Sequence, residues 1–339
     1  MSVSYGSALA VILFVIVATC GASASKPTLQ FRADGSFRIV QFTDAHDGPD
    51  VDPKTVSAMD RILDSAKPDF VVVTGDCVQT DRCKTQDDLK RAIDNIARPM
   101  EARGLPWAIT LGNHDLDNLA GIGVSLDMML GLYMKYPHNL NKRSPGGVFG
   151  VGNANVLISG STSGKPVFGI WLIDSNGHAG MGANERKIEG WDWVHFTQVR
   201  WYWDASVALE KRCGRKIPSL MFFHIPLREH KELMDAGKFT GEKNEECCCS
   251  LVNSGLFAAA LDRGDVKGMF VGHDHVNTLV GDWHGIKLGY SGSIGYDAYG
   301  LNSQDDAEKN RLRGARVFTL RESDPASFNT EYVTADSLK

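Results

Sequence analysis

Five short polar clusters, each following an apolar run, combine residue types that bind metal ions. Seven of the eight side chains supply oxygen and nitrogen donors of the kind that hard and borderline metal ions take. The eighth, His114, is free to act as a proton donor. The clusters contain no thiolate and therefore indicate Fe, Mn, Zn or Mg; their side chains are Asp44, His46, Asp76, Asn113, His114, His224, His273 and His275.

The spacing of these residues predicts a centre for two ions. Asp76 follows a continuous apolar run and is the natural carboxylate to bridge both cations. Asp44 and His46 occupy alternate positions just past an extended segment, and His273 and His275 repeat that spacing. Two ions about 3.5 to 4 Å apart can hold a phosphoryl group, lower the pKa of a bound water and stabilise the leaving oxygen. Hydrolysis of a phosphate ester uses all three effects.

The five clusters resemble, in order and approximate spacing, the motifs of the calcineurin-like metallophosphoesterases. Three longer strings are similar to the small purple-acid-phosphatase-like branch, at 222–227, 272–277 and 295–300. The resemblance spans about residues 35–320. It implies a four-layer α/β/β/α sandwich of the metallophosphoesterase type.

The resemblance also implies a division of the ligands between the ions. One ion takes Asp44, His46, Asp76 and His275, and the other takes Asp76, Asn113, His224 and His273. In this scheme a metal-bound hydroxide attacks phosphorus, and His114 protonates the leaving oxygen or stabilises charge on the phosphoryl group. The expected substrate is a small phosphate monoester. The alternatives are a phosphodiesterase and a non-catalytic protein that binds metal or phosphate.

The chain departs from the coloured purple acid phosphatases at three positions. Gln79 stands where they carry the tyrosine that gives the colour, and His46 stands where they carry glycine. Cys77 replaces the asparagine usual in the resembling branch. The resemblance thus supports a hydrolase, without the purple diiron state, and leaves Fe, Mn and Zn as candidate ions.

Taken singly, several of these residues have ordinary structural interpretations. Asp44 and His46 would more often be turn residues, Asn113 suits a helix cap, and His224 suits a buried core histidine. Their occurrence together favours the metal centre. Three further acids are expected to orient imidazoles: Asp115 beside His114, and Asp174 and Glu229 beside the ligand histidines.

Strands and helices alternate along the chain. Strands are expected at 37–42, 70–73 and 107–111, with helices at 52–65 and 85–103 between them. This order places each polar cluster at the carboxyl end of a strand, where open α/β sheets bind ligands. In the later part of the chain, loops with a short hairpin are expected at 136–163. Strands are expected at 167–173, 220–223, 266–271, 286–290 and 316–320, and helices at 197–211 and 254–261. We expect one phosphoesterase domain over residues 30–339.

The first 24 residues have the pattern of a signal peptide. An apolar stretch at 8–18 is short for a membrane span, and Ala22-Ser23-Ala24 follows as a cleavage pattern. The segment before the stretch has no basic residue, so an uncleaved anchor or lipidation at Cys20 stays open. We expect a secreted or extracytoplasmic protein with no membrane span after signal removal.

The charge composition gives no indication of nucleic-acid binding. Lys and Arg number 36 against 41 Asp and Glu, which gives a formal charge of −5 and no basic signature for nucleic acid. Oligomeric state cannot be predicted.

Six cysteines follow the signal segment and suggest disulfides in an exported chain, with the pairing left open: Cys77, Cys83, Cys213, Cys247, Cys248 and Cys249.

Overall fold

The computed structural model describes residues 1, 25–179 and 188–338. The segment expected to be a signal peptide lies, apart from Met1, outside the described residues. Within the described ranges, no helix combines the length and the apolar character needed to cross a membrane.

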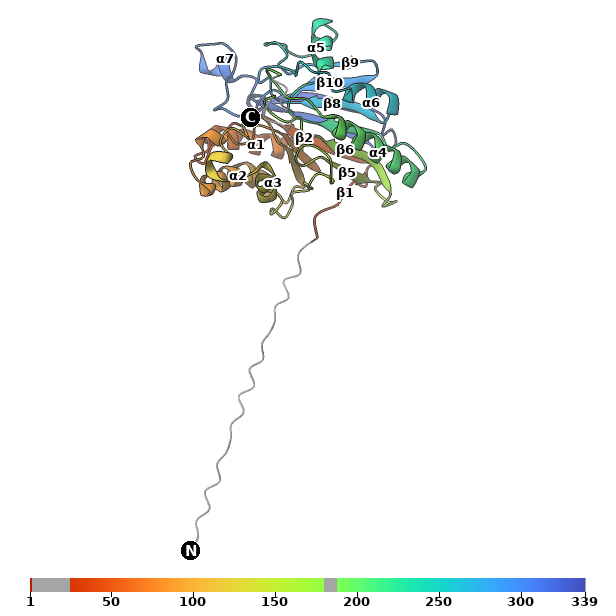
Figure 1. Cartoon of the computed structure of the whole chain (residues 1–339), viewed down its shortest axis with the longest axis horizontal. Coiled ribbons are helices and arrows are strands. Elements are labelled where there is room, and N and C mark those ends of the chain that lie inside the picture. Colours follow the sequence, from red (N-terminus) through yellow and green to blue (C-terminus); the bar gives the residue numbers. More distant parts are fainter. Residues whose placement is uncertain (2–24, 180–187, 339) are drawn as a thin grey trace.

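Two mixed β-sheets form the centre of the molecule (Figure 1). One has five strands in the order β12-β11-β2-β3-β4, and the other has seven in the order β1-β5-β6-β7-β8-β10-β9. The strands are β1 (Leu29–Gln30), β2 (Ser36–Phe42), β3 (Phe70–Thr74), β4 (Trp107–Thr110), β5 (Ala154–Ser159), β6 (Pro166–Leu172), β7 (Ser219–Phe222), β8 (Val266–Val271), β9 (Val280–Trp283), β10 (Ile286–Tyr290), β11 (Gly314–Arg321) and β12 (Phe328–Thr334).

Helices cover the outer faces of both sheets. Figure 1 shows α1, α2 and α3 gathered on one side of the molecule, away from α4, α5 and α6. Asp52 caps α1 with Pro53 at its start, and Thr85 forms a capping box with Asp88 at the start of α2, as the sequence predicts. The helices are α1 (Pro53–Ala66), α2 (Gln86–Glu101), α3 (Leu126–Tyr133), α4 (Phe196–Cys213), α5 (Arg228–Asp235), α6 (Leu256–Arg263) and α7 (Asp306–Asn310).

Alternating side chains divide the core into three layers. In β2, Ile39 packs into the cluster between the sheets, whereas Phe42 packs into the cluster beneath α1 and α2. In β8, Phe270 points to the centre and Met269 to the cluster beneath α4, α5 and α6. Helices, sheet, sheet and helices therefore stack in four layers, which confirms the predicted fold class.

The connections bring the polar clusters to one region. Strands β2, β3 and β4 are parallel neighbours, as are β6, β7 and β8. The carboxyl ends of parallel neighbours meet at the same edge of a sheet. Each of the five clusters follows one of these strands, so both sheets contribute ligands to a single site.

The described cysteines are all unpaired, so the structure does not form the disulfides expected from an exported chain. Cys77 and Cys83 are buried in the core beneath the helices. Burial raises the pKa of the Cys77 thiol well above its usual value, aided by the charges of Asp115 and Asp76. A neutral buried thiol is therefore the form that Cys77 takes.

Candidate metal centre

The backbone at the strand ends adopts a conformation that non-glycine residues rarely take. Asp44, His46, Asp76 and His273 have φ angles of 53°, 51°, 47° and 73°. Such left-handed residues cost about 1–3 kcal/mol each and persist where surrounding structure holds them, often at functional sites. Four of the seven expected ligands thus sit in strained backbone that turns their side chains to a common point.

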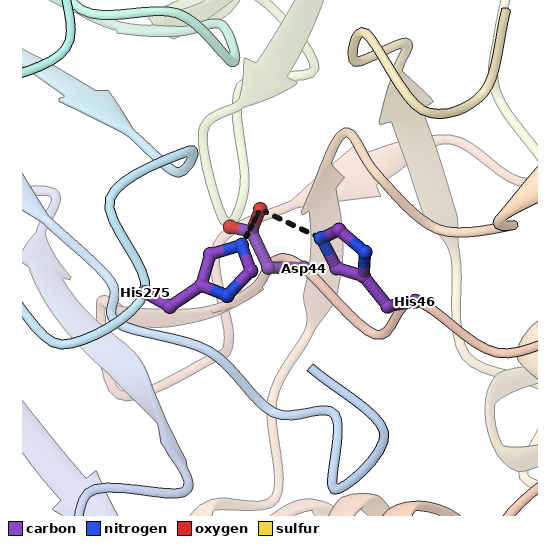
Figure 2. Close-up of side chains that lie close together, drawn as sticks. All are labelled: Asp44, His46 and His275. Atoms are coloured by element: carbon purple, nitrogen blue, oxygen red, sulfur yellow. Dashed lines mark ion pairs between the residues drawn. The ribbon is translucent and has the colours of Figure 1, made fainter. Parts of the chain in front are cut away.

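The carboxylate of Asp44 has one satisfied oxygen and one free oxygen. Oδ2 accepts hydrogen bonds from the Thr43 hydroxyl (2.7 Å) and from the backbone N–H of His273 (3.0 Å). Oδ1 is buried without a hydrogen-bond partner. It lies 3.3 Å from Nε2 of His275 and 3.6 Å from Nε2 of His46 (Figure 2). The free oxygen therefore faces the two imidazoles expected to share an ion with it.

Asp76 is oriented in the same manner, but between two groups of imidazoles. Its Oδ1 accepts a hydrogen bond of 2.7 Å from the backbone N–H of His114. Its Oδ2 lies 3.5 Å from Nε2 of His46 and 3.1 Å from Nε2 of His224. One oxygen of Asp76 is therefore close to nitrogens on both sides, which is the placement a bridging carboxylate needs.

His224 is held in one tautomer by the main chain. Its Nδ1–H donates to the carbonyl of Thr74 at 2.8 Å, so Nε2 is left with its lone pair when the ring is neutral. Three other polar atoms lie around that Nε2: Oδ2 of Asp76 at 3.1 Å, Oδ1 of Asn113 at 3.2 Å and Nδ1 of His273 at 3.3 Å. Each is able to offer a lone pair, so the group can be bridged either by hydrogen atoms or by a metal ion.

Donor atoms form two His/Asp triads compatible with metal binding. Asp44, His46 and His275 form one, and Asp76, His224 and His273 form the other; within each triad the donor atoms lie within 4.8 Å of one another. In the first triad Nε2 of His46 is buried without a hydrogen-bond partner, while its Nδ1 lies 3.4 Å from Oε1 of Gln79. Gln79 thus turns the free nitrogen of His46 toward the centre.

Charge and burial shape the titration of these groups. Burial alone would lower the pKa of His224, but the carboxylates of Asp76 and Asp44 raise it to about 10. Burial and the charge of His224 lower the pKa of His273 to about 3. Burial opposes ionisation of Asp44 and Asp76, yet neighbouring imidazoles hold both carboxyl pKa values below their usual range.

Two buried carboxylates need positive charge close by. Within residues 25–179 and 188–338, the ion-pair partners of Asp44 and Asp76 are imidazoles alone, with no lysine or arginine. A buried charge without a partner is costly, so this centre needs positive charge, carried either by protonated imidazoles or by metal ions. Orphaned buried donors, converging acceptors and concentrated negative charge all fit two metal ions. The donor set of imidazole, carboxylate and amide suits Fe, Mn or Zn.

His114 stands at the mouth of this centre. One of its ring nitrogens lies within 4.8 Å of donor atoms of His46 and Asp76. Nδ1 is 2.6 Å from Oδ2 of Asp117, and the side chain is 37% exposed. Asp117 fixes the orientation of the ring, and partial exposure gives a substrate access to it.

The three acids expected to orient imidazoles have other contacts. Asp115 accepts from the backbone N–H groups of Val78 and Gly112, and so braces the loops around the bridging carboxylate rather than the His114 ring. Burial and the charge of Asp76 raise the pKa of Asp115 to about 7. The role predicted for Asp115 is taken by Asp117.

Asp174 and Glu229 do not contact the ligand imidazoles by hydrogen bonds in the described structure. Asp174 accepts from the backbone of Val151 and Asn176, and Glu229 accepts from Asn253. Glu229 lies in the first turn of α5. The backbone of His224 is instead held by the Ser175 hydroxyl, which accepts from its N–H at 3.2 Å.

A cavity of about 320 Å³ opens over the metal centre. Five of the expected metal ligands line it together with His114, and two aromatic residues, Trp191 and Tyr299, line it as well. The ring of Tyr299 stacks on His275, and Trp191 meets His273 edge-on. Tyr299 belongs to the string at 295–300 that carries the family resemblance, whereas no pattern in the sequence marked Trp191.

Gly75 lies close against the ring of His224. Its φ is +85°, and a Cβ there would lie 2.6 Å from Nδ1 of His224 and 2.8 Å from the backbone N of Gly112. We expect Gly75→Ala to displace His224, to weaken metal binding, and to lower the free energy of unfolding by about 2–4 kcal/mol. Isothermal titration with Zn²⁺ and chemical denaturation measure these effects.

Gly147 provides the matched control for this substitution. Its φ is +81°, but a Cβ there would have no atom within 4 Å. Gly147→Ala therefore tests the backbone cost alone, which is about 1–2 kcal/mol, and should leave metal binding unchanged. Equal metal affinity in the two variants would show that Gly75 does not position His224.

Comparisons with known proteins agree with this geometry. Residues 37–277 match the calcineurin-like phosphoesterase family. The chain is 33% identical over 329 residues to "Probable inactive purple acid phosphatase 14" of Arabidopsis thaliana, covering 85% of this chain and 79% of that protein. It is 29% identical over 297 residues to "Phosphatase DCR2" of Saccharomyces cerevisiae, covering 79% of this chain and 49% of that protein.

Solved structures show the same fold at low sequence identity. A purple acid phosphatase of yellow lupin superposes with a TM-score of 0.53 at 12% identity, covering 90% of this chain and 52% of that chain. A dimetal phosphatase of Danio rerio gives a TM-score of 0.51 at 12% identity, covering 88% of this chain and 99% of that chain. At this identity the likeness concerns the fold alone.

Proposed function

Because the chain belongs to the calcineurin-like phosphoesterase family, we propose that it hydrolyses phosphate monoesters at a centre for two metal ions. The observation that carries this proposal is the position of Asp76. Its Oδ2 lies 3.5 Å from His46 on one side and 3.1 Å from His224 on the other, and both belong to groups of converging donors. A relative named as a phosphatase supports the choice of reaction.

In this proposal seven residues are metal ligands and one, His114, is a proton donor. Asp44, His46, Asp76 and His275 would hold one ion, and Asp76, Asn113, His224 and His273 the other. When bound, the two ions would orient the phosphoryl group, neutralise its charge and activate a water. Iron, manganese and zinc are the ions that we propose for this donor set.

His114 would act on the leaving group. Asp117 holds its ring at the cavity mouth, beside Asp76 and His46. From there the imidazole can donate a proton to the leaving oxygen, or a hydrogen bond to the phosphoryl group. One oxygen of each buried carboxylate is held from behind, Oδ2 of Asp44 by the Thr43 hydroxyl and the N–H of His273 and Oδ1 of Asp76 by the N–H of His114.

A second candidate is a non-catalytic protein that binds metal or phosphate. The names of three Arabidopsis relatives, each "Probable inactive", favour it. Against it, this chain brings all eight expected side chains to one site, including His114, which a binding protein does not require. A phosphodiesterase is a third possibility at the same site, and it differs in the ester accepted rather than in the ligands.

A panel of esters separates these functions. The metal-loaded protein is assayed with phenyl phosphate, glycerol phosphate and bis(p-nitrophenyl) phosphate, and release of phosphate or nitrophenol is followed. Turnover of both monoesters with little turnover of the diester supports the proposal. Turnover of the diester alone contradicts it in favour of a phosphodiesterase, and metal binding without any turnover favours the non-catalytic protein.

We further propose that the protein is exported and cleaved after about Ala24. The short apolar stretch at 8–18 and the small residues that follow it support this proposal. N-terminal sequencing of protein from the native host is expected to begin near Ser25. Material that begins at Met1, or that carries a lipid on Cys20, would contradict a cleaved, freely secreted form.

A further inference from the structure

Two aromatic side chains at the catalytic cavity are not explained by core packing. Trp191 and Tyr299 line the same cavity as His114 and the metal ligands. Neither belongs to the buried core, and Tyr299 is 51% exposed. An exposed aromatic ring at the entrance to a polar site offers apolar surface that a bound ligand can cover.

Tyr299 is fixed in place by contacts on two sides. Its ring stacks on His275, with centroids 3.9 Å apart and an interplanar angle of 16°. Its hydroxyl donates to Oε2 of Glu245 at 2.7 Å. The hydroxyl is therefore already satisfied, and what Tyr299 offers to a ligand is the free part of its ring.

Trp191 is held near the other group of ligands. Its ring meets His273 edge-on, with centroids 4.4 Å apart and planes at 90°. A second contact comes from His178, at 4.6 Å and 31°. Since His273 and His275 belong to different triads, the two aromatic rings flank the centre where a phosphoryl group would bind.

We infer that Trp191 and Tyr299 form an aromatic clamp that selects phosphate monoesters with an aromatic leaving group. This inference rests on the proposed function and names its substrate class as aryl phosphates, including the phosphotyrosine side chain. A planar ring attached to the phosphoryl oxygen would extend from the metal centre past His114 into contact with both rings. Aromatic pairs prefer stacked or edge-to-face arrangements, so the clamp favours an aryl group over an alkyl group.

Binding of phosphonates tests the clamp without the differing reactivity of aryl and alkyl esters. Phenylphosphonate and methylphosphonate carry the same acidic group and are not hydrolysed. Calorimetry on the zinc-loaded full chain is expected to show phenylphosphonate binding about tenfold more tightly. Tyr299→Leu and Trp191→Leu should each weaken phenylphosphonate about three- to tenfold and change methylphosphonate less than about twofold.

Two further variants make the test specific. Tyr299→Phe keeps the ring and should keep the preference. Phe196→Leu removes an aromatic ring that is 75% exposed on α4 and does not line the cavity, so it should change neither affinity. Zinc content is measured for every variant, because Tyr299 also packs on His275.

The outcomes distinguish the clamp from the proposed function. Equal affinity of the wild type for both phosphonates would overturn the clamp and leave the phosphomonoesterase proposal standing. Equal weakening of both phosphonates by the leucine variants would also overturn it, because that pattern reports displaced metal ligands. If neither phosphonate bound the zinc-loaded protein, the proposed function and the clamp would both be contradicted.

Discussion

Asp76→Asn is expected to remove most of the bound metal and to lower phosphomonoesterase activity by roughly a thousandfold or more. The substitution keeps the size of the side chain but removes the negative charge of Oδ2, the atom that lies near both His46 and His224. Both ions would lose their shared ligand. Metal analysis after dialysis and steady-state hydrolysis of phenyl phosphate measure the two effects together.

Asp235→Asn is the matched control for this variant. Asp235 ends α5, is exposed, and pairs with Lys231 rather than with the metal centre. It should bind metal and turn over as the wild type does. Retention of two ions and of wild-type activity by Asp76→Asn would show that Asp76 does not bridge the ions.

His114→Ala is expected to keep its metal ions and to lose activity in a way that depends on the leaving group. With glycerol phosphate, whose alkoxide is a poor leaving group, kcat should fall by about a hundredfold or more. With p-nitrophenyl phosphate, whose leaving group needs little protonation, the fall should be much smaller. Kinetics with the two esters, together with metal analysis, check this result.

Asp117→Asn tests the contact between His114 and Asp117 by changing the carboxylate instead of the imidazole. Asp117 lies 2.6 Å from Nδ1 of His114, so its loss should leave the ring present but less firmly oriented. We expect a reduction with glycerol phosphate that is smaller than that of His114→Ala. Equal losses for both esters in His114→Ala would argue against a proton-donor role and for a role in binding the phosphoryl group.

Local sequence patterns were sufficient to predict the framework of the fold. The β-branched run before Asp76 and the capping box at Thr85 and Asp88 are local signals, and both elements formed where expected. The elements that were not predicted include the helices α3, α5 and α7 and the strands β1, β9 and β12. The periodicity of α3 is weak because its sequence is apolar on most sides, and β12 gains its stability from pairing with β11.

The placement of the metal ligands was predictable because the same sequence pattern occurs at each of them. A polar cluster after an apolar run occurs five times, and parallel strands bring such ends together. The spacing of residues along the sequence did not predict which groups hold each imidazole in place by hydrogen bonds. The carbonyl that fixes His224 belongs to Thr74, 150 residues away in the sequence. Likewise, spacing alone cannot tell which of two acids in one turn, Asp115 or Asp117, faces His114.

Metal content measured against activity tests the central claim most directly. Apo-protein is titrated with Zn²⁺ or Mn²⁺, bound metal per chain is determined, and hydrolysis of phenyl phosphate is followed at each step. A centre built around the bridging Asp76 predicts saturation at two ions per chain, with activity rising as the second site fills. Full activity at one ion per chain, or no hydrolysis at two, would contradict it.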